Sequence, residues 1–76
     1  HVDHLLVDER GQVDVVMAEG MQLTLGAEDF LGRMHRFEEV YRSELIARRA
    51  EVEKVDLRYK NGVAVTFSES SQVAEL

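Results

Sequence analysis

The sequence predicts an α+β domain: an antiparallel three-strand meander, one long helix, and a C-terminal β-hairpin, with the helix packed on one sheet face. Apolar residues alternate with polar ones near the start of the chain and again over residues 55–67, as in half-buried strands. Between these regions the apolar spacing becomes helical. At 76 residues, with 45% hydrophobic and 32% charged residues, the chain is one small domain or part of one.

The meander is predicted from two turns that end in glycine, Glu9-Arg10-Gly11 and Ala18-Glu19-Gly20. Three-residue loops at these positions match the apolar faces of neighbouring strands, whereas a slip of one residue would move every side chain to the other face. The predicted pairs are Leu5 with Val15, Val7 with Val13, Val15 with Leu23, and Val13 with Leu25. The core face of this meander would comprise Leu5, Val7, Val13, Val15, Met17, Met21, Leu23 and Leu25.

The helix is predicted from about Ala27 to Ala50. Gly26 is a usable N-cap, acidic residues at 28 and 29 suit the start of a helix, and basic residues at 48 and 49 suit its end. The apolar stripe, with spacings of four, three, four and four, consists of Phe30, Met34, Phe37, Tyr41 and Leu45. This stripe is expected to pack on the core face of the sheet.

The last hairpin turns at Lys60-Asn61-Gly62, with Gly62 in the left-handed region. A three-residue loop puts six apolar side chains on one face by pairing Tyr59 with Val63, Leu57 with Val65, and Val55 with Phe67. A two-residue loop would split that set between two faces. The final strand is predicted to be an open sheet edge, which can accept a strand from another chain. Residues 68–76 have no periodicity and are predicted to be a polar flexible tail.

Composition and motifs argue against several functions. A net charge of −6 argues against binding to a phosphate backbone, and no apolar run approaches the roughly 20 residues of a membrane span. There is no cysteine and no phosphate-binding glycine motif, and no serine has an evident histidine partner. His1, Asp3, His4 and Asp8 could suggest a metal site, but nothing completes a ligand set. We therefore expect no enzyme activity, no cofactor and no metal.

Two stretches of sequence carry a family resemblance. One is Val-Asp-Leu-Arg-Tyr at 55–59, followed by an Asn-Gly turn and a short apolar strand ending in an aromatic residue. The other is a strand and glycine at 20–26, then Arg-Met-His-Arg-Phe at 33–37. In this order they resemble the C-terminal end of the bacterial cell-division family FtsQ/DivIB. Residues 1–67 would then be the C-terminal portion of an FtsQ-type β-domain.

The resemblance also implies a location and a function. FtsQ proteins are single-span membrane proteins with most of their mass outside the cytoplasm, so this part would lie on the periplasmic side of the inner membrane. It would be a non-catalytic divisome scaffold whose last strand and hairpin bind FtsB, itself paired with FtsL, by strand addition. The implied partner-binding residues are Arg58, Tyr59, Asn61, Gly62, Val63, Ala64, Val65 and Phe67, with Arg10 as the nearest match to a basic contact further upstream.

Two residues depart from the family pattern: Phe67 stands where well-known members have Trp, and Lys60 where many have Pro or Asp. From the residues alone, Tyr59 and Phe67 can also be core residues beneath the helix. Two other functions therefore stay open. The chain could be a structural half-domain with a covered hairpin, or the small-molecule-binding or catalytic half of an α+β enzyme. A bare edge at residues 63–67 would favour the scaffold, and polar groups converging on an apolar pocket would favour the enzyme.

Overall fold

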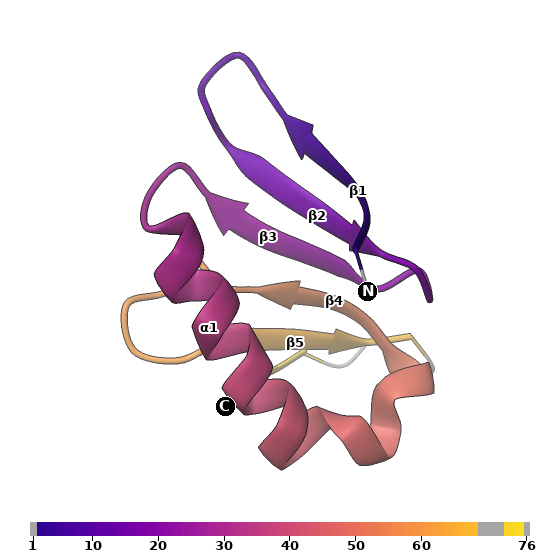
Figure 1. Ribbon diagram of the computed structural model, residues 1–76. Helices are drawn as coiled ribbons and strands as arrows, with labels where there is room; N and C mark the ends of the chain where they lie inside the picture. The colour runs from indigo at the N-terminus through magenta and orange to yellow at the C-terminus, as the bar shows by residue number, and fades with distance from the viewer. Residues whose placement is uncertain (1, 69–72, 76) are drawn as a thin grey trace.

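The computed structural model describes residues 2–68 and 73–75 and contains a mixed sheet with one α-helix across one of its faces (Figure 1). In spatial order the six strands are β1 (Val2–Val7), β2 (Val13–Met17), β3 (Gln22–Gly26), β4 (Val52–Asp56), β5 (Ala64–Phe67) and β6 (Val73–Glu75). All neighbours are antiparallel except β3 and β4, which are parallel and are connected through the helix α1 (Phe30–Val40). The α+β class is confirmed.

The first two turns follow the predicted register closely. Leu5 opposes Val15 and Val7 opposes Val13 between β1 and β2, and Val15 opposes Leu23 between β2 and β3. Gly11 and Gly20 have φ values of 81° and 98°, which a glycine adopts without a steric penalty. One predicted pair is wrong: Val13 opposes Gly26 rather than Leu25, because the ladder is irregular between Val13 and Asp14.

The predicted register of the third turn is wrong by two residues. Val55 opposes Val65 instead of Phe67, so residues 57–63 form the connection rather than residues 60–62. Strand β4 ends early because the Asp56 carboxylate accepts the backbone N–H of Arg58 at 3.0 Å, a local turn that competes with the ladder. Tyr59 consequently lies in the connection and is 49% exposed, not part of the core face.

The helical segment is shorter and less regular than predicted. Asp29, not Gly26, is the N-cap: its Oδ1 accepts the N–H of Gly32 at 3.2 Å. After Val40 the chain continues as a π-helical segment, Tyr41–Leu45, and a 3-10 segment, Ile46–Glu51, which holds the two arginines expected at the end of the helix. Phe37 and Leu45 are buried, as the stripe predicted, whereas Phe30 is 38% exposed.

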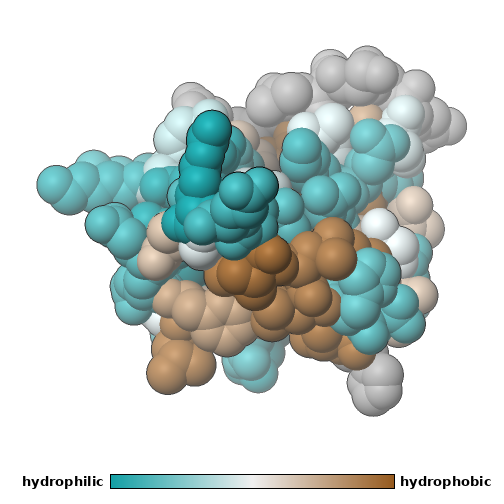
Figure 2. All heavy atoms as spheres, turned by 90° about the horizontal axis from the view of Figure 1, so that it is seen from above, coloured by the Kyte–Doolittle hydropathy of each residue, from teal (hydrophilic) through white to brown (hydrophobic). Residues whose placement is uncertain are grey.

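The core lies between α1 and the middle of the sheet. Its buried residues are Val15, Met21, Leu23, Leu25, Phe37, Leu45, Val52, Val55, Leu57, Val63, Val65 and Phe67. Leu5 and Val7, predicted to line this face, are 47% and 58% exposed, since α1 lies over the central strands and β1 is at the edge of the sheet. Figure 2 views the molecule from above Figure 1, where β1 and β2 lie, and shows apolar side chains gathered at the surface there.

The outer side of β5 is not the bare edge that the sequence predicted. Strand β6 pairs with it through Ala64 with Glu75, Val65 with Ala74, and Thr66 with Val73. The predicted polar tail at 68–76 falls largely outside the described residues, but its part at 73–75 is a strand rather than a free segment.

Gly62 provides a test of the connection between β4 and β5. Its φ is 131°, where a β-branched residue is strained, so Gly62→Val should lower the free energy of unfolding by about 1 kcal/mol or more. Urea denaturation followed by circular dichroism would measure the change. Asn61→Val is the matched control: it adds the same side chain at an exposed neighbour without positive φ, and should stay within about 0.5 kcal/mol. Equal effects of the two substitutions would contradict the assigned role of Gly62.

Candidate functional site

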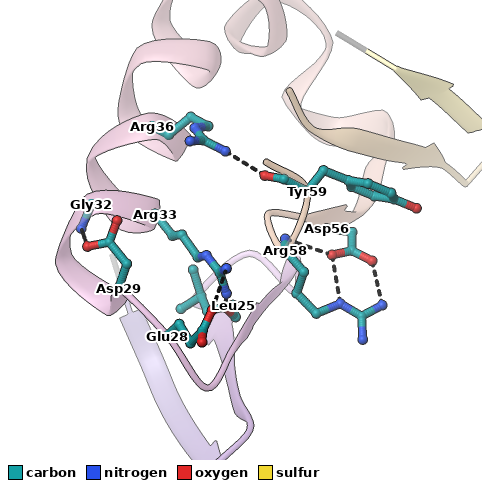
Figure 3. A network of polar contacts seen from close by, with 9 residues as sticks. All are labelled: Leu25, Glu28, Asp29, Gly32, Arg33, Arg36, Asp56, Arg58 and Tyr59. Atoms are coloured by element: carbon teal, nitrogen blue, oxygen red, sulfur yellow. Dashed lines mark hydrogen bonds and ion pairs between the residues drawn. The ribbon is translucent and has the colours of Figure 1, made fainter. Parts of the chain in front are cut away.

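Three connections meet at one end of the sheet: residues 8–12, residues 27–29, and residues 57–63. They lie at this end because β1, β3 and β4 run in the same direction, so the connections that follow these strands leave from the same end of the sheet. The third connection carries three exposed side chains in succession, Arg58, Tyr59 and Lys60. Figure 3 shows the Tyr59 ring pointing away from α1.

Arg58 is held by a bidentate ion pair with Asp56. Its Nε donates to Asp56 Oδ1 at 3.0 Å and its Nη2 donates to Oδ2 at 2.7 Å (Figure 3). The hydrogen bond from the Arg58 side chain, which outweighs the opposing effect of burial, lowers the pKa of Asp56 below its usual value. The pair therefore orients the guanidinium and satisfies part of its hydrogen-bonding capacity within the domain.

Two arginines of α1 connect the helix to this end of the sheet. Arg36 Nη1 donates to the backbone carbonyl of Tyr59 at 2.8 Å, and Arg33 Nη1 donates to the carbonyl of Leu25 at 2.5 Å (Figure 3). A Cβ at Gly26 would lie 2.8 Å from Arg33 Nη1 and 3.1 Å from the Arg58 side chain. Gly26 thus leaves room for both arginines, and Arg36 fixes the backbone beneath the exposed Tyr59 ring.

The structure divides the predicted partner-binding residues into two groups. Asn61 is exposed and Ala64 is half-buried, whereas the side chains of Val63, Val65 and Phe67 point into the core. The buried group can offer a neighbouring strand only its backbone N–H and C=O groups. Exposed side-chain contacts at this site are therefore limited to the connection, chiefly at Arg58 and Tyr59.

Phe67, at the end of β5, has a second constraint. The Arg48 guanidinium lies 4.0 Å from the centroid of its ring, as in a cation–π contact, and Arg48 Nε also donates to Glu51 Oε1 at 3.2 Å. Only 6% of Phe67 is exposed. The ring is therefore a packing residue in this structure, consistent with the core alternative that the sequence left open.

Arg10 lies in the turn between β1 and β2, at the same end of the sheet but far from Arg58 across it. The backbone N–H of Arg10 donates to Asp8 Oδ1 at 2.8 Å, which stabilises the turn, and Arg10 is exposed. About three strand spacings separate the two connections, or roughly 14 Å at about 4.8 Å per strand. One short contact on a partner would not reach both arginines.

A separate groove of about 360 Å³ lies between α1 and the ends of β1 and β2. It is lined by Val2, Met17, Glu19, Met21, Met34, Phe37, Glu38, Tyr41 and Arg42. Its polar side chains lie at the surface: Glu38 and Arg42, which are 3.6 Å apart, are each more than half exposed. They do not converge on the apolar interior, so the groove lacks the arrangement that would favour an enzyme.

Within residues 2–68 and 73–75, no three histidine, cysteine or acidic side chains are grouped to hold a metal ion. His4 Nδ1 contacts Asp3 Oδ2 at 2.9 Å, and His1 of the suggested cluster lies outside the described residues. In that same part of the chain, no helix is both long and apolar enough to cross a membrane.

Sequence reasoning missed the supporting residues of the site, Asp56, Arg33 and Arg36. A local signal was available for Asp56, because an aspartate two residues before an arginine can accept its backbone N–H and form a turn. The arginines are three residues apart on α1 and so project from the same side of the helix. Their targets are backbone carbonyls in other elements, which a one-dimensional pattern does not identify.

The Asp56–Arg58 pair should make stability depend on pH in the acid range. The pKa of Asp56 is lowered in the folded state, so its contribution is complete above the unfolded value of about 3.9 and is lost as pH falls through the lower folded value. Asp56→Asn should therefore be less stable than the parent at pH 7, with the difference shrinking below about pH 4. Urea unfolding between pH 7 and pH 2.5 would measure it, with Glu53→Gln, at an exposed position of the same strand, as control. A constant difference across this range would contradict the ion-pair argument.

Comparison with known proteins identifies the family. A model of the C-terminal region of cell division protein FtsQ/DivIB matches residues 1–58. The cell division protein FtsQ of Hahella chejuensis is 36% identical over 66 residues, covering 87% of this chain and 24% of that protein. Those of Alcanivorax borkumensis and Xanthomonas campestris pv. campestris are each 33% identical, over 63 and 64 residues, covering 83% and 84% of this chain.

Fold and site together define a small α+β domain with an exposed, arginine-anchored connection that leads into strand β5. The chain belongs to the FtsQ/DivIB cell-division family, as its C-terminal region. It spans about a quarter of the length of the relatives it matches, 23% to 24% in the three cases above. The relatives are cell-division proteins by name, and membership of this family supports a role in cell division.

Proposed function

We propose that this domain is a non-catalytic scaffold of the bacterial divisome that binds FtsB, paired with FtsL, through strand addition beside β5. In this proposal the domain lies on the periplasmic side of the inner membrane, in a protein held by an N-terminal span outside these residues. The observation that carries the proposal is the exposed Tyr59, 49% accessible on a connection that Arg36 fixes at 2.8 Å. Tyrosine is among the residues enriched where a few side chains dominate the binding energy of an interface.

In this proposal the partner strand pairs with the outer edge of β5, which β6 occupies in this structure. The side chains of Val65 and Phe67 in this strand are buried, so β5 offers a partner its backbone groups and the half-buried Ala64 and Thr66. Backbone pairing tolerates many sequences, so selectivity must come from flanking side chains. The connection at 57–63 supplies such side chains directly before β5.

Charge favours an acidic segment next to this connection. The chain carries a net charge of −6, yet Arg58 and Lys60 are exposed here and Arg36 lies close by. An acidic partner residue would be attracted locally and repelled elsewhere, which guides orientation more than it adds affinity. Because Asp56 already pairs with Arg58, we expect loss of Arg58 to weaken binding by only about 0–1 kcal/mol. Arg10 would contribute only if the partner continues across the end of the sheet.

The test of strand addition is titration of the extracytoplasmic region with a synthetic peptide from the extracytoplasmic part of FtsB. Ala64→Pro adds a ring at the start of β5 and removes a backbone N–H that faces β4, so it should distort the strand on which a partner would add and weaken binding at least about tenfold. Ala64→Ser is the matched control, because it alters the same side chain but keeps the N–H, and it should bind as the parent does. Thermal unfolding of both variants checks that the fold survives.

If both substitutions leave the affinity of the FtsB peptide unchanged, the partner docks elsewhere and strand addition beside β5 is wrong. A peptide that fails to bind the parent protein would favour the alternative in which this region has only a structural role. These two results are separable, because the first still requires measurable binding.

A further inference from the structure

Strand β6 occupies the edge of β5 at which the partner strand is proposed to add. Ala64, Val65 and Thr66 are paired with Glu75, Ala74 and Val73, and the opposite edge of β5 is paired with β4. A strand has only two edges that can form a ladder, so the outer edge of β5 holds one neighbour at a time.

We propose that residues 73–75 are an intramolecular competitor of the partner strand, so that β6 must leave before the partner can pair with β5. This inference rests on the proposed function and adds a regulatory step to it: the edge alternates between a closed state, with β6 in place, and an open state that is competent for binding. The affinity of a partner then scales with the fraction of molecules in the open state.

The extent of β6 suits this role. It has three residues against four in β5, so its ladder is short and a longer strand can replace it with more hydrogen bonds. A partner would also gain contacts at Tyr59, which is half exposed in the connection that leads into β5.

The chain that leads to β6 is fixed at the end of β5. The backbone N–H and the Oγ of Ser68 both donate to the carbonyl of Glu51, at 2.8 Å and 3.2 Å. Only residues 69–72 separate Ser68 from Val73. A segment attached over so short a distance has a high effective concentration, on the order of millimolar, at its target edge. Even weak pairing by three residues can then lower the apparent affinity of a free peptide.

A disulfide between β5 and β6 tests the competition directly. Thr66 and Val73 are register partners, and Thr66 is on the face of β5 opposite to its buried side chains, so Thr66→Cys/Val73→Cys should link the strands without disturbing the core. These 76 residues contain no other cysteine. The variant is made in the full extracytoplasmic region, and binding of the FtsB-derived peptide is measured before and after reduction. The single variant Thr66→Cys controls for the side-chain change.

We expect the oxidised variant to bind the peptide at least about tenfold more weakly than the same protein after reduction. Deletion of residues 69–76 should act in the opposite direction and tighten binding by about threefold to tenfold, as an open fraction of about 10–30% would give. Hydrogen exchange should show protection of the amides of β6 that is lost when the peptide binds.

Equal binding by the oxidised and reduced variant would overturn the competition but not binding of the peptide itself, because the peptide would then dock without displacing β6. Failure of the two cysteines to link under oxidising conditions would also overturn it, because β6 would not pair with β5 in this register. If the peptide binds neither the parent nor the reduced variant, the proposed function fails, and the competition fails with it.

Discussion

Phe37→Ala should lower the free energy of unfolding by about 3–5 kcal/mol, the usual cost of truncating a large core side chain. Phe37 is 5% exposed, and its ring lies 5.6 Å from that of Tyr41, at a tilt of 45°. It projects from α1 onto the core that the central strands share. A domain of this length is expected to have a stability of roughly 4–11 kcal/mol, so the loss could be a large part of the total.

Denaturant unfolding followed by circular dichroism would measure this loss. Leu31→Ala is the matched control, because it truncates an apolar side chain on the same helix that is 79% exposed. It should change stability by no more than about 0.5 kcal/mol. If Phe37→Ala cost no more than this control, the assignment of the helix face to the core would be wrong.

Tyr59→Ala should weaken binding of the FtsB peptide by about 2 kcal/mol or more, which corresponds to about 30-fold in the dissociation constant. The ring is half exposed, so its loss should leave the fold stable, and Arg36 holds the backbone carbonyl of the residue rather than its side chain. The substitution therefore separates partner binding from packing.

Isothermal titration of the extracytoplasmic region with the peptide gives the dissociation constant of each variant. Leu31→Ala again serves as control, since it removes an exposed apolar side chain from the helix rather than from the connection. A dissociation constant within twofold of the parent for Tyr59→Ala would mean that the ring takes no substantial part in binding. A large loss of stability would instead show that Tyr59 is a core residue in solution.

The side chains that share one face of the sheet were largely predictable, but the pairing register of neighbouring strands was not predictable in every case. Alternation places Val55, Leu57, Val63 and Val65 on one face whether the offset is zero or two residues, so these residues were predicted correctly although the third turn was wrong. Tyr59, predicted on the same face, is exposed because the longer connection takes it out of the ladder. What decided between the offsets was the Asp56 side chain, which accepts the Arg58 N–H and ends β4. The spacing of apolar residues predicts which side chains are buried, but it does not reveal a local side-chain-to-backbone hydrogen bond of this kind.

The candidate site was located from a sequence resemblance rather than from chemistry. The exposed Arg58 and Tyr59 are where the motif implied, but their supports on α1 are fixed by tertiary contacts that no local pattern contains. Strand β6 was missed for a related reason: three residues carry too little periodicity to predict a strand, and their pairing depends on the neighbouring β5.

The single parallel pairing in the sheet has a consequence for the order of folding. Turns of a few residues connect β1 to β2 and β2 to β3, whereas β3 and β4 are separated by residues 27–51. Closing that longer segment costs roughly 1–1.5 kcal/mol more entropy than closing a turn of about five residues. The portion from β1 to β3 can therefore form early from local contacts. The parallel pairing of β3 with β4, the seam of the sheet, forms only after α1 has docked. Until that seam closes, both of its strands are unpaired edges, so slow docking of α1 would prolong the interval in which nascent chains can associate wrongly.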